Sequence, residues 1–110
     1  MSTKTVILLE SNKAVLAQLN GAFEESEDFK VIYVGDDGDD GIKQIGSLKP
    51  DLVIVGMFLK GTDGCGVIHA TKKAFADMKV VAMGLPSDDM IEKALAEGAN
   101  YYLVKPFTIS

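Results

Sequence analysis

The sequence contains very little cysteine: Cys65 is the single one among 110 residues. One cysteine has no partner for an internal disulfide, which favours a reducing, cytoplasmic setting. Long apolar runs are also missing, since no stretch approaches the roughly 18 residues that a membrane-spanning helix needs. The first residues, MSTKTVILLE, carry an apolar run too short for a secretory signal peptide. These absences predict a cytoplasmic domain without disulfides or membrane spans.

Basic residues are outnumbered, with 11 Lys and Arg against 16 Asp and Glu, for a net charge of -5. Nucleic acids and anionic membranes attract positive surfaces, and the sequence shows neither a basic stripe nor a helix-turn-helix pattern. We therefore expect this chain alone to bind neither of them. Internal repeats, linkers and low-complexity segments are absent as well, so we predict one domain, residues 1–110.

Short apolar segments alternate along the chain with segments of helical spacing. Residues such as Val15, Leu16 and Leu19 recur at helical intervals, and Ser11 or Asn12 precedes them as a candidate cap. The alternation predicts a parallel sheet with helices on both faces, in the doubly wound, flavodoxin-like order 2-1-3-4-5. The expected strands are residues 5–9, 30–35, 51–55, 79–84 and 100–105, and the expected helices are residues 12–26, 39–49, 66–75 and 87–99.

The carboxyl ends of the predicted strands form the edge where sheets of this kind place their functional groups. Two of these ends, Gly56 and Gly84, bring no side chain to that edge. Two interpretations stay open: a pocket opened for a ligand, or drift in a site that is no longer used. The residues at the five strand ends are Glu10 with Ser11, residues 35–37, Gly56, Gly84 and Lys105.

The closing segment EGANYYLVKPF, and PDLVIV followed by GTDG, resemble the receiver domain of two-component response regulators. The resemblance extends along essentially the whole chain. It implies a phosphate-accepting aspartate at the end of the third strand, an acidic pair for Mg²⁺ after the first, a hydroxyl after the fourth, and a lysine and cis-proline after the fifth. The residues at these positions are Gly56, Glu10 with Ser11, Gly84, and Lys105 with Pro106, of which the lysine matches in full.

These departures have a chemical consequence. Phosphoryl transfer needs a nucleophile, a cation and donors for the phosphoryl oxygens. With Gly56 at the acceptor position and Glu10 as the one remaining carboxylate, we predict a pseudo-receiver with no catalytic residue, no metal site and no Mg²⁺ binding. Asp51 lies roughly 16 Å from Gly56 along the strand, so Asp63 in the following loop is the better substitute acceptor.

Lys105 lacks its phosphate partner in this interpretation. We expect it to form an ion pair with Glu10, the carboxylate left at the ends of the first, third and fourth strands. The alternative is a solvated lysine that keeps its place because Pro106 follows it.

The predicted function is phosphorylation-independent protein–protein interaction in bacterial signalling or transcriptional control, without enzymatic activity. The partner is another protein or an output domain, and a homodimer is an open alternative. A hypothesis of another class is a small-molecule sensor that holds an anionic ligand between Gly35, Gly56, Gly84 and Lys105. A receiver with a displaced acceptor such as Asp63 ranks last. The resemblance implies an interaction surface on the fourth helix and fifth strand, formed by Asp88, Asp89, Ile91, Glu92, Leu95 and Tyr102.

Four further features receive structural interpretations. The family continues into a fifth helix, whereas this chain stops at Ser110, so we expect an apolar patch on the third to fifth strands that an output domain or second copy covers.

Cys65 starts a helix, where a thiol pKa can fall, but we interpret it as a packing residue. His69 has too few neighbouring ligands for a metal site. We interpret the acidic run 36–40 as a solvated turn into the second helix.

Overall fold

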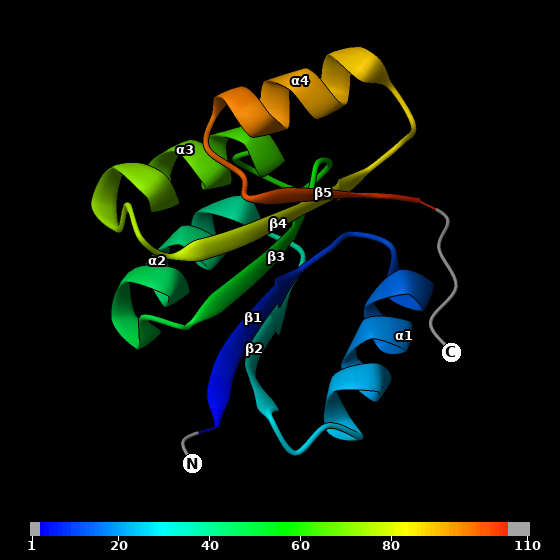
Figure 1. Cartoon of the computed structure of the whole chain (residues 1–110), viewed down its shortest axis with the longest axis vertical. Helices are drawn as coiled ribbons and strands as arrows, with labels where there is room; N and C mark the ends of the chain where they lie inside the picture. The colour runs from blue at the N-terminus through cyan, green and yellow to red at the C-terminus, as the bar shows by residue number, and fades with distance from the viewer. Residues whose placement is uncertain (1–2, 106–110) are drawn as a thin grey trace.

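The computed structural model describes residues 3–105, which form a central sheet between two layers of helices (Figure 1). The strands run parallel in the order β2-β1-β3-β4-β5, as predicted. One helix, α1, lies on one face, and α2, α3 and α4 lie on the other (Figure 1). Within the described residues, the elements are β1 (Lys4–Leu9), α1 (Lys13–Glu24), β2 (Phe29–Gly35), α2 (Gly38–Leu48), β3 (Leu52–Gly56), α3 (Gly64–Ala74), β4 (Lys79–Gly84), α4 (Asp88–Ala96) and β5 (Tyr101–Val104).

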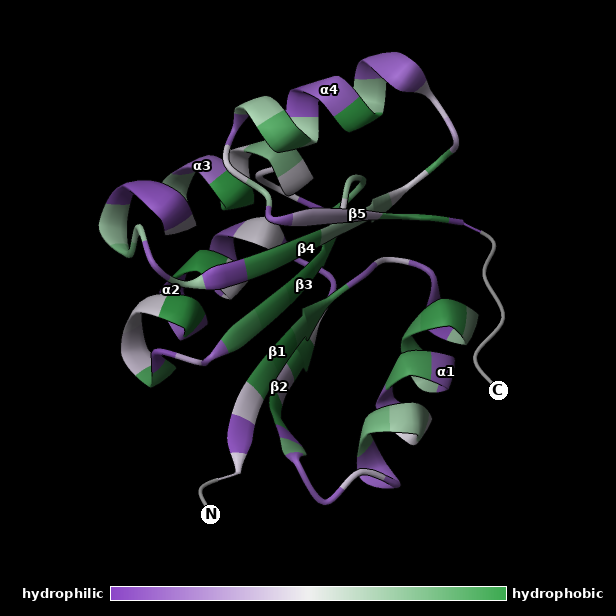
Figure 2. Cartoon of the chain, viewed as in Figure 1, coloured by the Kyte–Doolittle hydropathy of each residue, from purple (hydrophilic) through white to green (hydrophobic). Residues whose placement is uncertain are grey.

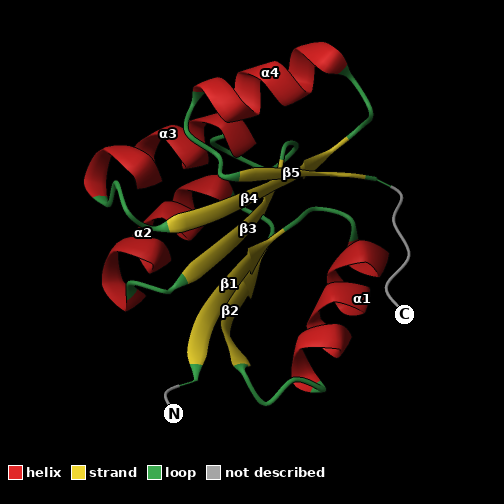
Figure 3. Cartoon of the chain, viewed as in Figure 1, coloured by secondary structure: helices red, strands yellow, loops and turns green. Residues whose placement is uncertain are grey.

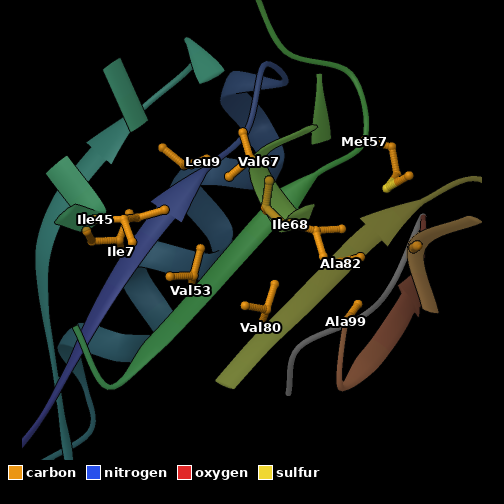
Figure 4. Packing of buried hydrophobic residues seen from close by; sticks show 12 residues of the cluster. Ile7, Leu9, Ile45, Val53, Met57, Val67, Ile68, Val80, Ala82 and Ala99 are labelled. Atoms are coloured by element: carbon orange, nitrogen blue, oxygen red, sulfur yellow. The ribbon is translucent and has the colours of Figure 1, made fainter. Parts of the chain in front are cut away.

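The central strands are apolar along their length because both of their faces are covered (Figure 2). Side chains alternate between the faces, so neighbours in β1 belong to different packing clusters. Val6 and Leu8 pack on the side of α1, whereas Ile7 packs with α2 to α4. In Figure 4, Ile7 and its partner Val53 lie side by side on the face that α3 covers. Burial of this kind is the main favourable term in folding.

The α1 face holds a smaller cluster that one helix supplies. Leu19 is buried there, with Val15 and Leu16 packed around it as the helical spacing predicts. The rings of Phe23 and Phe29 meet edge to face, with centroids 5.5 Å apart at 71°. This aromatic contact packs the end of α1 against the start of β2 and so stabilises the connection between them.

Helix boundaries follow from capping groups, and Figure 3 shows the short connections that carry them. Asn12, and not Ser11, caps α1 by accepting hydrogen bonds from the N–H groups of Ala14 and Val15. The second helix ends at Leu48, one residue before its predicted end, because Lys49 adopts a left-handed conformation with φ 46°.

The fourth helix is shorter than predicted. It ends at Ala96, and Gly98 follows with φ +113°, a conformation that favours glycine. None of the helices in residues 3–105 is long and apolar enough to cross a membrane.

The sheet face beside α1 is only partly open. Tyr101 and Leu103 of β5 are 72% and 38% exposed, whereas Ile54 and Met83 of the neighbouring strands are buried. The expected apolar patch is therefore confined to the outer part of the sheet. The expectations of a cis-proline and of a chain without the fifth helix concern Pro106 and the residues after it. These residues lie outside the described ones.

Candidate functional site

The carboxyl ends of four parallel strands meet at one edge of the sheet. The main chain fixes their spacing: the N–H of Lys105 donates to the carbonyl of Gly84 at 2.7 Å, and the N–H of Met57 donates to that of Met83 at 2.9 Å. The register pairs Gly56 with Met83 and Gly84 with Val104. Glu10 follows β1 on the same edge. The fold therefore brings these predicted site residues together.

Glu10 and Lys105 form the predicted ion pair, with Nζ of the lysine 2.6 Å from Oε1 of the glutamate. The carboxylate side chain is 1% exposed and the lysine side chain is 18% exposed. No hydrogen-bond donor in the described chain reaches Oε1 at favourable angles, so charge attraction to the ammonium is what compensates its burial. A buried carboxylate without such a partner is strongly unfavourable.

The second oxygen of Glu10 is also engaged. Oε2 accepts a hydrogen bond from the N–H of Asn12 at 2.8 Å, in the turn that begins α1. The carboxylate thus joins β1, α1 and the end of β5 through its two oxygens. Mg²⁺ is usually held by one or two carboxylates with free oxygens, and the one carboxylate of this cluster has both of its oxygens engaged. The residues present do not fit the magnesium site that the receiver resemblance implies.

Gly56 has a structural reason to lack a side chain. A β-carbon at this position would overlap Oε1 of Glu10 and lie 3.0 Å from its Cδ. The carboxylate of the glutamate therefore fills the space in front of the end of β3. This filled space does not favour the interpretation of an opened pocket, and the interpretation of drift in an unused site stays a prediction. The contact comes from a residue 46 positions away in the chain.

Gly84 is closed in a similar way by Tyr102, Met90 and Met57. A β-carbon at position 84 would overlap the tyrosine hydroxyl and lie 2.7 Å from the sulfur of Met90 and 2.9 Å from Cγ of Met57. The tyrosine hydroxyl donates to the carbonyl of Leu85 at 2.8 Å. Burial raises the pKa of this hydroxyl, and nearby Cys65 adds to the rise. The phenol is therefore held inward and neutral over Gly84.

Gly35, the third glycine of the cleft expected for a small anion, is likewise covered. A β-carbon there would lie 2.8 Å from the hydroxyl of Tyr33. Lys105, the residue expected to attract the anion, already contacts Glu10. The glycine positions are thus packed against side chains.

The remaining candidate acceptors lie outside this cluster. Ser11 is exposed, and the ion pair does not involve it. Asp63 caps α3, its Oδ1 accepting from the N–H of Gly66 at 2.9 Å. Asp51 precedes β3 at the opposite edge, where the N–H of Thr5 donates to its Oδ2 at 2.7 Å and lowers its pKa.

The acidic run 36–40 has structural roles. Asp37 caps α2, and Asp36 pairs with Lys60 at 3.1 Å. The hydroxyl of Thr62 donates to Asp39 at 2.5 Å, which joins the first turn of α2 to the loop before α3. These acids therefore fasten two loops together, which is more than the solvated turn expected. Among residues 3–105, no group of three or more His, Cys, Asp or Glu side chains is placed to hold a metal ion.

Cys65 and His69 behave as structural residues. Burial raises the pKa of the Cys65 thiol, and the negative charges of Asp63 and Glu97 add to this effect, so the lowering that a helix start can produce does not prevail. His69 is exposed, with Nδ1 2.9 Å from a carboxylate oxygen of Glu97.

The predicted interaction surface is exposed on α4 and less so on β5. Leu95 is 46% exposed although it is apolar. Asp88, Asp89 and Glu92 are exposed as well, while Ile91 is half-buried. Tyr102 packs against the core.

Reasoning from the sequence missed a cavity between the start of α4, the residues after β3 and the start of α3, which shares Asp89 with the predicted surface. Its volume is about 260 Å³, and Phe58 is exposed at its margin. Phe58 is the second residue after the end of β3, and an aromatic residue at that place is the signal that could have revealed the cavity.

A model of the response regulator receiver domain matches residues 6–110. The chain belongs to this family. This receiver domain is 31% identical over 104 residues to the "Probable C4-dicarboxylate response regulator DctR" of Priestia megaterium, covering 94% of this chain and 46% of the relative. It is 29% identical over 104 residues to the transcriptional regulatory protein LiaR of Bacillus subtilis, covering 91% and 48%.

A solved structure shares the fold of this receiver domain. The signal receiver domain of NarL from Mycobacterium tuberculosis matches it with a TM-score of 0.91 at 21% identity, covering 98% of this chain and 88% of the other. The chain spans about half the length of the curated relatives it matches. It is therefore comparable to the receiver part of a signalling regulator.

Proposed function

We propose that this receiver domain is a docking module of a response regulator and that its interactions do not depend on phosphorylation at the end of β3. The observation that carries the proposal is the Glu10–Lys105 pair, which fills the space in front of Gly56. Phosphoryl transfer needs a nucleophile and a cation at that place. Here a glycine supplies no nucleophile, and both oxygens of the nearest carboxylate are engaged.

The closed packing at Gly84 supports the same proposal. In the family, a hydroxyl at this position contacts the phosphoryl group; here the hydroxyl of Tyr102 lies over the glycine and is bonded to Leu85. No observation favours the alternative of an anion sensor, because the glycines of its cleft face filled space. The domain then acts by contact with a protein or output domain, as a non-enzymatic part of a larger regulator.

The first experiment is an intact-mass measurement after incubation with acetyl phosphate and Mg²⁺. We expect no gain of a phosphoryl group, because the carboxylate that pairs with Lys105 within residues 3–105 is the buried one of Glu10. An unrelated receiver with an acceptor aspartate serves as the positive control. A gain that maps to Asp63, Glu10 or Ser11 would contradict the proposal and establish a displaced acceptor.

A second experiment tests the docking surface on α4. Leu95 and Leu48 are exposed leucines on different helices, at 46% and 43%. We expect Leu95→Ala and Glu92→Ala to reduce self-association and partner capture about tenfold, because truncating an interface anchor costs more than 1 kcal/mol. Leu48→Ala on α2 is the matched control and should change neither self-association nor partner capture. Sedimentation and capture from an extract of the source cell measure the two effects.

Tyr102→Ala completes this series, with Tyr102→Phe as its control for the hydroxyl alone. If Leu95→Ala, Glu92→Ala and Tyr102→Ala all behave like Leu48→Ala, docking does not use this surface.

A further inference from the structure

The cavity beside α4 has a size and lining that suit a protein side chain. It measures about 260 Å³, below the range of roughly 300–1,000 Å³ typical of pockets for drug-sized ligands. We infer that this cavity receives an apolar side chain of a partner peptide that carries basic residues next to it. The inference rests on the proposed docking function and adds the chemistry of the partner. The lining residues of this α4 cavity are Met57, Phe58, Asp63, Cys65, Ser87, Asp89, Met90 and Lys93.

Phe58 gives the α4 cavity an apolar margin. Its side chain is 58% exposed, although Met57 beside it is 6% exposed. An exposed phenylalanine exposes apolar surface to water until a partner covers it. Aromatic residues in pockets of this kind are frequent energetic anchors of protein interfaces. The floor is apolar too, because Met57 and Met90 contribute thioether side chains that adapt to different apolar shapes.

Cys65 contributes to the lining as a neutral group. Burial raises the pKa of its thiol, so the protonated form predominates at neutral pH. A thiol of this kind behaves as a small apolar residue. Cys65 therefore adds no charge to the lining of the cavity.

The charged residues around the α4 cavity favour a basic partner. Asp63 and Asp89 line it, against one cation, Lys93. Asp88 is exposed next to Asp89, and the chain as a whole carries a net charge of -5. A lysine or arginine beside the inserted apolar side chain would meet these carboxylates, and an acidic partner would be repelled.

The walls of the α4 cavity are held in place before any partner arrives. The N–H of Gly64 donates to the carbonyl of Met57 at 2.9 Å, which closes the connection from β3 to α3. Main-chain hydrogen bonds also join this connection to the residues at the start of α2. The N–H of Lys60 donates to the carbonyl of Asp36 at 3.0 Å, and the N–H of Gly38 donates to the carbonyl of Lys60 at 2.8 Å. A preformed site binds without the cost of ordering a loop.

Methionine methyl groups report on the α4 cavity directly. The protein carries five methionines, and among those in the described residues Met57 and Met90 line the cavity while Met78 does not. The experiment labels all methionine methyl groups with ¹³C and titrates a short peptide with a leucine flanked by lysines. We expect the signals of Met57 and Met90 to shift with the same saturation curve, and the Met78 signal to stay in place.

Variants separate the apolar and the charged contributions to binding. Phe58→Ala should weaken binding at least about fivefold, while Tyr101→Ala, which truncates an exposed aromatic residue at the opposite end of the sheet, should not. Asp89→Asn should weaken binding about threefold, because it removes one exposed charge contact. Added salt should weaken wild-type binding for the same reason. Thermal melting of each variant confirms that it is folded.

Several results would overturn the inference. The site is wrong if the Met57 and Met90 signals do not move, or if Phe58→Ala and Tyr101→Ala bind alike. The charge preference is wrong if a peptide with glutamates in place of the lysines binds as well. These outcomes can be distinguished from failure of the docking function itself. If Leu95→Ala loses partner capture while the methionine signals stay in place, the docking surface on α4 is supported and only the role of the cavity is contradicted.

Discussion

Replacing Lys105 with methionine is expected to lower the free energy of unfolding by about 3 kcal/mol. The substitution keeps the length of the side chain and removes the charge that lies 2.6 Å from Glu10. The carboxylate is 1% exposed and would then keep the N–H of Asn12 as its polar partner. An uncompensated buried charge of this kind is costly. Urea unfolding of the two proteins, followed by circular dichroism, measures the difference.

An exposed ion pair in the same chain provides the matched control. Lys60 and Asp36 are 3.1 Å apart, with side chains 73% and 45% exposed. Lys60→Met should therefore cost less than about 1 kcal/mol. The double variant Glu10→Gln with Lys105→Met should recover part of the loss, because it removes the stranded charge as well. Equal effects of Lys105→Met and Lys60→Met would mean that the Glu10 pair does not stabilise the fold.

Introducing an aspartate at position 56 is expected to destabilise the protein by about 3 kcal/mol. The new β-carbon would overlap Oε1 of Glu10, and the new carboxylate would place a second negative charge beside the first. One of the two side chains must then leave the contact with Lys105. Urea unfolding measures the loss, and Gly56→Ala separates the steric part from the charge.

Two comparisons make this prediction specific to the space in front of β3. Gly46 lies in the last turn of α2 with open space around it, so Gly46→Ala should stabilise the protein by about 0.5–1 kcal/mol. Glu10→Ala combined with Gly56→Asp should recover most of the loss, because one carboxylate again faces Lys105. If Gly56→Asp is neutral, the glutamate does not occupy that space.

The regular part of the fold could be predicted from local pattern. Buried strands such as β3, Leu52–Gly56, carry no polar side chain because helices cover both of their faces, although the strand begins one residue later than predicted. Positions one residue apart, such as Ile7 and Leu8, then belong to opposite faces without further information. Helix ends were less accurate: α4 stops at Ala96 rather than at residue 99, since its end depends on the left-handed turn at Gly98.

The Glu10–Lys105 contact could also be predicted, because strand order alone brings the ends of β1 and β5 to the same edge. The filling of the space in front of Gly56 could not be predicted from the sequence. It depends on which way the side chain of Glu10 turns, and that direction is set by the N–H of Asn12 and the ammonium of Lys105. Gly84 is similar, because the tyrosine that covers it belongs to the next strand.

The sequence by itself determined the class of fold, the strand order, the resemblance to receiver domains and the residues that meet at the carboxyl edge. The class of fold follows from periodicity and from the order of the segments along the chain, whereas the resemblance rests on the motifs EGANYYLVKPF and PDLVIV with GTDG. Only the tertiary structure decided that Glu10 fills the place in front of Gly56, that Tyr102 closes Gly84, and that Phe58 borders a cavity with Met90. Each of these is a contact between side chains from distant segments. Such contacts depend on rotamers and on close packing, which no local pattern encodes.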